Sequence, residues 1–238
     1  MSSMVPSQAL EQEATQQYAD ILKQAQAKGL LDRDAQQVAR VRAISQRLIA
    51  QAGVFRPDAA SWKWEVHVLS SNEVNAWCMP GGKIAVYTGL IAKIKPTDDE
   101  LAAVLGHEIS HALREHARER VSQQMATNLG LSVLAIATGS TAASDLGGQL
   151  TSVMFTLPNS RTHESEADRM GVELAARAGY DPRAAVTLWQ KMGAAEQGSA
   201  PPEILSTHPS AESRISDLQA AAQQVLPLYE QSKGRAAR

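Results

Sequence analysis

The chain has 238 residues, with 23 lysines and arginines against 25 aspartates and glutamates, which gives a formal net charge of −2 at pH 7. This balance excludes the basic surface typical of nucleic-acid-binding proteins, so no nucleic-acid partner is expected. The single cysteine, Cys78, excludes an intramolecular disulfide and a multi-cysteine metal cluster. The length predicts one domain with appendages, and an aromatic content of only 4%, beside many alanines, glutamines and leucines, predicts a mainly helical chain.

Two amphipathic helices are predicted first. Apolar residues recur at helical spacing over residues 8–28 and again over residues 33–52, and Gly29 and Gly53 follow the two runs. We therefore expect residues 1–54 to form a helical pair that packs on the core. The first residues show no basic segment followed by an apolar one, so no secretion signal is predicted, and a cytoplasmic and an exported protein both stay open.

The next segments are typical of a small β-sheet. Residues 62–69 alternate between apolar and polar side chains, residues 75–78 are extended, and residues 83–87 form a third candidate strand. Pro80-Gly81-Gly82 favours a hairpin turn over a phosphate-binding loop, because the glycines are not followed by lysine and then serine or threonine. The predicted fold class is α+β, predominantly helical, with a small antiparallel or mixed sheet.

Helices are predicted again after residue 96. Thr97 and Glu100 form the pattern of a capping box at the start of the first of them. The main domain is expected to span residues 55–230. Its later helices are predicted over 159–178, from 182 onward and over about 210–228, and a disordered basic tail is predicted over 231–238.

Residues 121–144 form a run of 24 consecutive uncharged residues, which is long enough to cross a bilayer. Polar residues such as Gln123 and Asn128 interrupt the run and add to the cost of membrane insertion. A partly buried helical hairpin is therefore the preferred interpretation. A membrane-spanning helix and a surface that rests on a membrane are the alternatives.

The motif His107-Glu108-Ile109-Ser110-His111 lies on the helix that follows the capping box. The two histidines project from one face, about 40° apart, and Glu108 flanks them. A zinc hydrolase needs this arrangement: two imidazoles as ligands, and a carboxylate that takes a proton from water. A charged surface helix is the alternative, but unpaired histidine and glutamate on a core-facing helix would be costly.

A third ligand is predicted from a second helix, because catalytic zinc needs three protein ligands and an open fourth position. Glu164 and Asp168 are four residues apart and share a helix face. Glu164 is the candidate ligand, and Asp168 is the candidate acceptor for the ring N–H of a zinc-bound histidine. Glu166 is expected to face solvent or to pair with Arg161 or Arg169. Alternatively, both carboxylates on the shared face are ordinary surface charges.

His107-Glu108-x-x-His111 followed by Glu164-x-x-x-Asp168 resembles the zinc metallopeptidase family M48, which includes CAAX prenyl endopeptidases, HtpX-type proteases and soluble bacterial proteases of the BepA–LoiP lineage. Two further segments carry the resemblance, which covers about residues 35–220. They are Asn75-Ala76 ahead of Pro80-Gly81-Gly82, which resembles the family's edge-strand segment, and Thr207-His208-Pro209 with Arg214-Ile215, which resembles its C-terminal motif.

The resemblance implies a gluzincin-like fold with one Zn²⁺ per chain, and polypeptide substrates that pair with the edge strand at Asn75 and Ala76. It implies two alternative roles for His208, as a stabiliser of the oxyanion or as a latch that occupies the open zinc position. In the second case, Arg214 is the candidate for oxyanion support. The implied zinc ligands are His107, His111 and Glu164, with Glu108 as the general base.

The predicted function is a zinc-dependent endopeptidase that cleaves unfolded or misassembled proteins in cell-envelope quality control. The absence of the several spanning helices found in membrane-embedded members disfavours a prenylated substrate. A periplasmic location is expected. An outer-membrane lipid anchor, a peripheral membrane association and a partner in the envelope assembly machinery are left open. The alternatives are a latent, zinc-containing chaperone-like or scaffold protein, and a purely structural zinc site with four protein ligands.

Other residues are expected to have structural roles. A helix continued from His107 would direct His116 away from the metal, and His163 is expected to face elsewhere. Cys78 and Trp77 are expected to pack in the core near the sheet. His67 is expected to lie solvated on the polar face of its strand.

Overall fold

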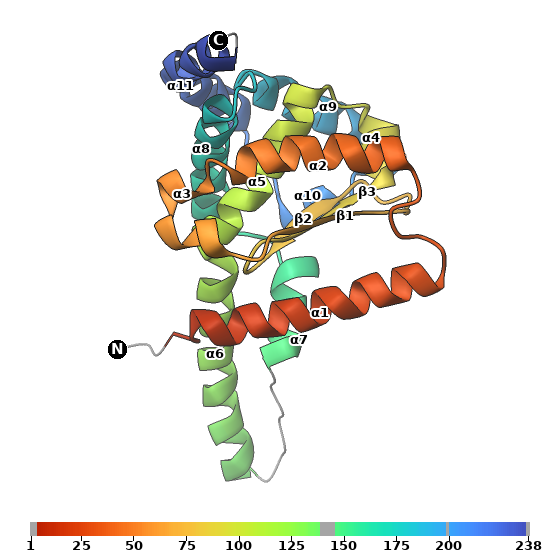
Figure 1. The fold of residues 1–238 in the computed structure, drawn as a ribbon. Coiled ribbons are helices and arrows are strands. Elements are labelled where there is room, and N and C mark those ends of the chain that lie inside the picture. The colour runs from red at the N-terminus through yellow and green to blue at the C-terminus, as the bar shows by residue number, and fades with distance from the viewer. Residues whose placement is uncertain (1–3, 139–145, 199, 237–238) are drawn as a thin grey trace.

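The computed structural model describes residues 4–138, 146–198 and 200–236 of the chain (Figure 1). Its sheet has three strands in the order β1-β3-β2. β1 (Glu65–Leu69) pairs in parallel with β3 (Lys83–Tyr87), whereas β2 (Ala76–Met79) pairs antiparallel with β3. The sheet is therefore mixed, and β2 forms one of its edges.

The turn between β2 and β3 is the predicted hairpin. Gly81 and Gly82 have positive φ angles of 86° and 93°. A Cβ atom on Gly82 would lie 2.6 Å from the ring of Trp64, so both backbone conformation and space call for glycine. β1 begins later than predicted, at Glu65, and Trp62 packs against Trp64 ahead of it, with ring centroids 5.3 Å apart.

The two N-terminal helices lie on opposite faces of the sheet (Figure 1). α1 (Ser7–Ala27) packs Leu10 and Tyr18 with Trp77 on one face, and α2 (Ala35–Ile49) packs on the other face together with α5. They cover the sheet from two sides and do not form a pair. An amphipathic pattern shows which side of a helix is buried, but not against which face of a sheet. α3 (Ala52–Phe55) and the 3-10 helix η1 (Pro57–Ser61) lead into β1.

α4 (Thr88–Ile94) is followed by α5 (Asp98–Leu113), which is buried over most of its length. The predicted capping box starts α5. The hydroxyl of Thr97 accepts the backbone N–H of Glu100, and the Glu100 carboxylate accepts the backbone N–H of Thr97. The cap fixes where α5 begins and therefore the direction in which its histidines project.

α8 (Arg161–Arg177) crosses α5 at a pair of glycines. A Cβ atom on Gly106 of α5 would lie 3.0 Å from the carbonyl oxygen of Gly171 of α8. The two glycines therefore let the helix backbones approach closely. α9 (Ala184–Glu196) packs on α5, and α10 (Ile204–Thr207) follows as a single turn.

The helical geometry is interrupted between α5 and α6 (His116–Thr138). Glu115 has a positive φ of 54°, which ends α5, and α6 begins at the next residue and extends beyond α1 (Figure 1). α7 (Leu146–Phe155) packs against α6 and α1, and residues 139–145, which include the tip of the predicted hairpin, lie outside the described residues. Within the described part of the chain, no helix is long and apolar enough to cross a membrane.

α11 (Arg214–Ala236) packs against α8 and α9. It continues past the predicted end near residue 228, so the predicted disorder from residue 231 is wrong as far as the helix reaches. Tyr229 is buried, and the Ser232 hydroxyl donates to the carbonyl oxygens of Ala176 and Arg177 at the end of α8. These contacts hold this part of α11 against the fold.

Candidate active site and metal centre

Four buried side chains converge at one point between the helices. His107 and His111 come from α5, Glu164 comes from α8, and His208 follows α10. One nitrogen or oxygen atom of each lies within 4.8 Å of the others. The structure therefore brings the three predicted zinc ligands together with His208.

The separations between these atoms fit one small cation. Nε2 of His107 and Nε2 of His111 are 3.1 Å apart, and they lie 3.4 and 2.8 Å from Oε2 of Glu164. Nδ1 of His208 lies 2.9 Å from the same oxygen and 3.2 Å from Nε2 of His107. A tetrahedral zinc site with bonds of about 2.0–2.1 Å has edges of about 3.3–3.4 Å. The donor types and their spacing both suit zinc.

Asp168 lies where the sequence predicted an acceptor. Its Oδ1 is 3.0 Å from Nδ1 of His107, the ring nitrogen that faces away from the cluster. Such a contact fixes the ring orientation of a histidine ligand. Glu164 and Asp168 therefore project from the same face of α8: Glu164 belongs to the cluster, and Asp168 lies behind it and contacts His107.

Arg214 lies beside the cluster and contacts the carboxylates of α8. Its guanidinium donates to Asp168 Oδ1 at 2.7 Å and to Glu164 Oε1 at 3.3 Å, and it stacks on the ring of Trp189 at 3.5 Å. It lies behind these carboxylates, in the groove between α8 and α11, and does not line the cleft that contains Glu108. Its contacts instead hold the two carboxylates of α8 in place.

Glu108 is buried beside the cluster. Its Oε1 lies 3.0 Å from Nε2 of His208 but has no hydrogen bond of good geometry to a described residue. Burial opposes ionisation of Glu108, but the neighbouring histidines, His208 foremost, hold its pKa below the usual value. Burial likewise opposes ionisation of Glu164, and His107 and His208 lower its pKa. Both carboxyl groups are therefore ionised at neutral pH, and Glu108 can accept a proton.

The histidines differ in charge. Burial lowers the pKa of His111 to about 3, so its ring is neutral and can offer a lone pair. Burial also disfavours the charged form of His208, but Glu108 and Glu164 outweigh it and raise the pKa of His208 to about 10. Two buried carboxylates so close together require positive charge beside them. A proton on His208 or a metal cation can supply that charge.

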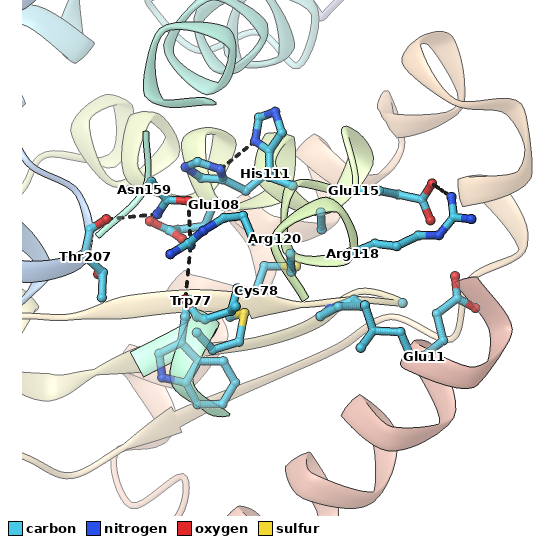
Figure 2. A pocket seen from close by; sticks show the side chains of 18 of the residues that line it. Glu11, Trp77, Cys78, Glu108, His111, Glu115, Arg118, Arg120, Asn159 and Thr207 are labelled. Atoms are coloured by element: carbon cyan, nitrogen blue, oxygen red, sulfur yellow. Dashed lines mark hydrogen bonds and ion pairs between the residues drawn. The ribbon is translucent and has the colours of Figure 1, made fainter. Parts of the chain in front are cut away.

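The cluster opens onto a cleft between α5 and β2 (Figure 2). Glu108 and His111 line one side of it, and Trp77 of β2 lies across from them. Within the described residues, β2 pairs with β3 alone, so the cleft follows a free edge of the sheet. The predicted substrate-binding residues Asn75 and Ala76 lie at the start of this edge and line the same cleft.

The segment that carries His208 is tied to α6. The backbone N–H and the Nδ2 group of Asn159 both donate to the carbonyl oxygen of Thr207 at 2.9 Å. Arg120 of α6 donates in turn to Oδ1 of Asn159 at 3.0 Å, and Figure 2 shows these three residues side by side at one end of the cleft. The residue before His208 is therefore held in place by Asn159.

Three residues near the cluster were not predicted to be there. His116 was expected to point away, but the helix break at Glu115 turns it back, and its Nδ1 lies 2.8 Å from Nδ1 of His111. Glu166 contacts Nε2 of His116 at 2.7 Å instead of facing solvent or the arginines expected for it. His163 stacks on His116, with ring centroids 4.0 Å apart. Helical periodicity could not reveal these contacts, since it assumes an unbroken helix.

Of the remaining residues expected to have structural roles, two lie where predicted and one is less exposed than predicted. Cys78 and Trp77 are buried, as expected. His67 is only partly exposed to solvent, with 21% of its side chain accessible, and its Nδ1 lies 2.6 Å from Oδ2 of Asp32. These residues take no part in the cluster.

Comparison with known proteins identifies the family. Mitochondrial metalloendopeptidase OMA1 of Arabidopsis thaliana is 42% identical over 151 residues, and that of Schizosaccharomyces pombe is 38% identical over 177 residues; these matches cover 63% and 72% of this chain. The Beta-barrel assembly-enhancing protease of Escherichia coli K12 is 32% identical over 205 residues, or 81% of this chain. The matches span only 30%, 49% and 40% of these relatives' own lengths. The model of peptidase family M48 matches residues 35–222, which include the whole cluster, so the chain belongs to peptidase family M48.

Proposed function

We propose that this chain is a zinc-dependent endopeptidase. The observation that carries the proposal is the position of the buried Glu108 carboxylate, between a cluster of zinc-type donors and a cleft along a free sheet edge. Zinc in such a set polarises a carbonyl group and lowers the pKa of water to about 7. His107, His111 and Glu164 hold the ion. Glu108 accepts the proton of the attacking water and returns it to the leaving nitrogen of the peptide.

The substrates in this proposal are extended polypeptide segments. The free edge of β2 offers backbone groups that can pair with any extended chain, and Asn75 and Ala76 begin that edge. The walls of the cleft are partly apolar, with Trp77, Val153 and Met154 among the lining residues. Unfolded proteins expose both extended backbone and apolar side chains, which supports them as the substrate class.

His208 acts as a latch in this proposal. Its Nδ1 lies at the position of a fourth donor, 2.9 Å from Oε2 of Glu164, so these four side chains would together hold a zinc ion and leave no position for water. Its Nε2 also faces the base, Glu108, at 3.0 Å. Oxyanion support would instead require a ring nitrogen free to donate into the cleft. The four-donor arrangement is therefore the latent form, and His208 must move before water enters.

The same arrangement favours one alternative function. A site with four protein ligands is typical of structural zinc, and it suits a latent zinc protein with a chaperone-like or scaffold role. Zinc binding alone does not separate the two. Peptide cleavage separates them, because only a protease needs Glu108 as a general base.

The test compares the zinc-loaded wild type with Glu108→Gln and His208→Ala on unfolded casein, with and without a chelator. We expect chelator-sensitive cleavage by the wild type, and a loss of several orders of magnitude in Glu108→Gln with about one zinc per chain retained, since only the proton acceptor is gone. If wild type and His208→Ala both bind zinc but neither cleaves, the structural or scaffold alternative stands. If Glu108→Gln cleaves normally, Glu108 is not the base.

The cellular role proposed is protein quality control in a bacterial envelope. One relative is called a Beta-barrel assembly-enhancing protease and others are mitochondrial metalloendopeptidases, which supports a compartment bounded by membranes. We propose a periplasmic location, with attachment to the outer membrane by a lipid or a peripheral contact and an assembly-machinery partner as finer alternatives. Proteins trapped in cells by Glu108→Gln would identify substrates and partners, and trapping of cytoplasmic proteins alone would contradict this location.

A further inference from the structure

We propose that His116 is a positioning residue for His111: it accepts the hydrogen bond of the His111 Nδ1–H group and, held by Glu166, keeps Nε2 of His111 directed at the zinc position. The inference rests on the proposed zinc site. It assigns a task to three residues that the proposed reaction does not use, His116, Glu166 and His163.

The first step is the contact between the two rings. Nδ1 of His111 and Nδ1 of His116 are 2.8 Å apart and both rings are buried, so one hydrogen atom lies between the two nitrogens. Nε2 of His111 faces Glu164 and Nε2 of His107, where it offers its lone pair to a metal. A neutral His111 that binds through Nε2 carries its proton on Nδ1. His111 is therefore the donor, and His116 is the acceptor.

The second step fixes the tautomer of His116. If its Nδ1 accepts, the proton of the neutral ring is on Nε2, and Nε2 lies 2.7 Å from Oε2 of Glu166. Arg114 holds the same carboxylate oxygen at 3.2 Å. The contacts thus form a chain from Glu166 through His116 and His111 to the zinc position, and each N–H group in this chain faces an acceptor.

The third step fixes the plane of the His116 ring. The ring of His163 stacks on it with centroids 4.0 Å apart and an angle of 10° between the planes. Nε2 of His163 is itself held by Glu119 at 3.1 Å. One face of His116 is therefore covered by a ring that is anchored to α6, which restricts rotation of His116 away from His111.

The arrangement parallels that of the other histidine ligand. Asp168 contacts Nδ1 of His107 directly, at 3.0 Å. For His111, an imidazole stands between the ligand and its carboxylate, because the break at Glu115 returns His116 to this position. Carboxylates behind zinc-bound histidines set ring orientation and ligand strength, and their loss typically costs about 10–100-fold in metal affinity.

The experiment measures the zinc affinity of the full chain by competition with a chromophoric chelator, and records the absorption spectrum of the cobalt-loaded protein. His116→Phe keeps a ring for His163 but removes the acceptor, whereas His116→Asn keeps an acceptor oxygen attached at the same branch of the side chain. We expect about 10–100-fold weaker zinc binding and an altered cobalt spectrum for His116→Phe, and recovery to within about threefold for His116→Asn. His67→Asn, which removes a histidine on β1, serves as the control and should match the wild type.

Two results would overturn the inference: zinc affinity of a folded His116→Phe within about threefold of wild type, or His116→Asn as weak as His116→Phe. If His116→Phe does not fold, Glu166→Ala decides, because this side chain is 25% exposed and its loss leaves the core intact. Weaker zinc binding by Glu166→Ala supports the inference, and unchanged binding contradicts it. A wild type that binds no zinc contradicts the proposed function itself, which separates the two failures.

Discussion

The crossing of α5 and α8 gives the sharpest test of how the fold positions the metal site. A Cβ atom added by Gly171→Ala would lie 3.0 Å from the backbone nitrogen of His107 and 3.2 Å from its Cα, where ordinary contacts begin at 3.4 Å. Both neighbours are backbone atoms that cannot rotate away, so the helices must part by about 0.4 Å, the difference between 3.0 and 3.4 Å. Glu164 and His107 sit on opposite sides of this gap.

Overpacking of this kind costs about 1–3 kcal/mol, which lowers the thermal midpoint of a protein of this size by about 2–12 °C. Metal–ligand distances tolerate only about 0.2 Å, so zinc affinity should fall about tenfold or more. Thermal unfolding and chelator competition measure the two effects. Gly193→Ala on α9 is the matched control, because no atom lies within 4 Å of its added Cβ, and it should gain up to about 1 kcal/mol of helix stability. Equal midpoints and zinc affinities for the two variants would refute the reasoning.

Three further predictions concern the site itself. Asp168→Ala should weaken zinc binding about 10–100-fold in a chelator competition, and an unchanged affinity would make Asp168 an ordinary charged residue. His208→Ala should raise basal casein cleavage about tenfold if the latched form holds about nine molecules in ten, whereas lower activity with intact zinc would assign His208 to oxyanion support. Zinc at about a thousand times its Kd should stabilise the fold by about 4 kcal/mol, so a chelator should lower the thermal midpoint by about 8–16 °C; an unchanged midpoint would mean that the ion does not link α5 to α8.

The sequence was sufficient for the parts of the site that depend on local geometry. Thr97 and Glu100 predicted the start of α5, and from there the spacing of His107 and His111 placed both rings on one face. The four-residue spacing of Glu164 and Asp168 worked for the same reason, because the helix that carries both is unbroken. Regular helices make side-chain direction predictable from residue number.

The sequence-based predictions failed where the backbone departs from regular helix geometry, or where long-range packing determines which way a side chain or a helix faces. Glu115 adopts a positive φ without a glycine or proline beside it, so nothing in the sequence marked the break that returns His116 to the site. Arg214 lies near the cluster, but only the packing of α11 on α8 decides that it faces Asp168 and not the cleft. The placement of α1 and α2 on opposite faces of the sheet is a long-range choice of the same kind.

The free edge of β2 has a consequence for what such an enzyme would discriminate. Backbone pairing itself carries no information about side chains, so a protease that binds through this edge selects substrates first by their conformation, and the partly apolar walls of the cleft add a preference for apolar side chains. Most extended segments of a folded protein are already paired, so such a segment becomes available mainly during local opening. When opening and closing are fast relative to cleavage, the rate of cleavage follows the equilibrium population of the open form. The enzyme would then sort its targets by their conformational stability, with the least stable proteins in its compartment degraded first.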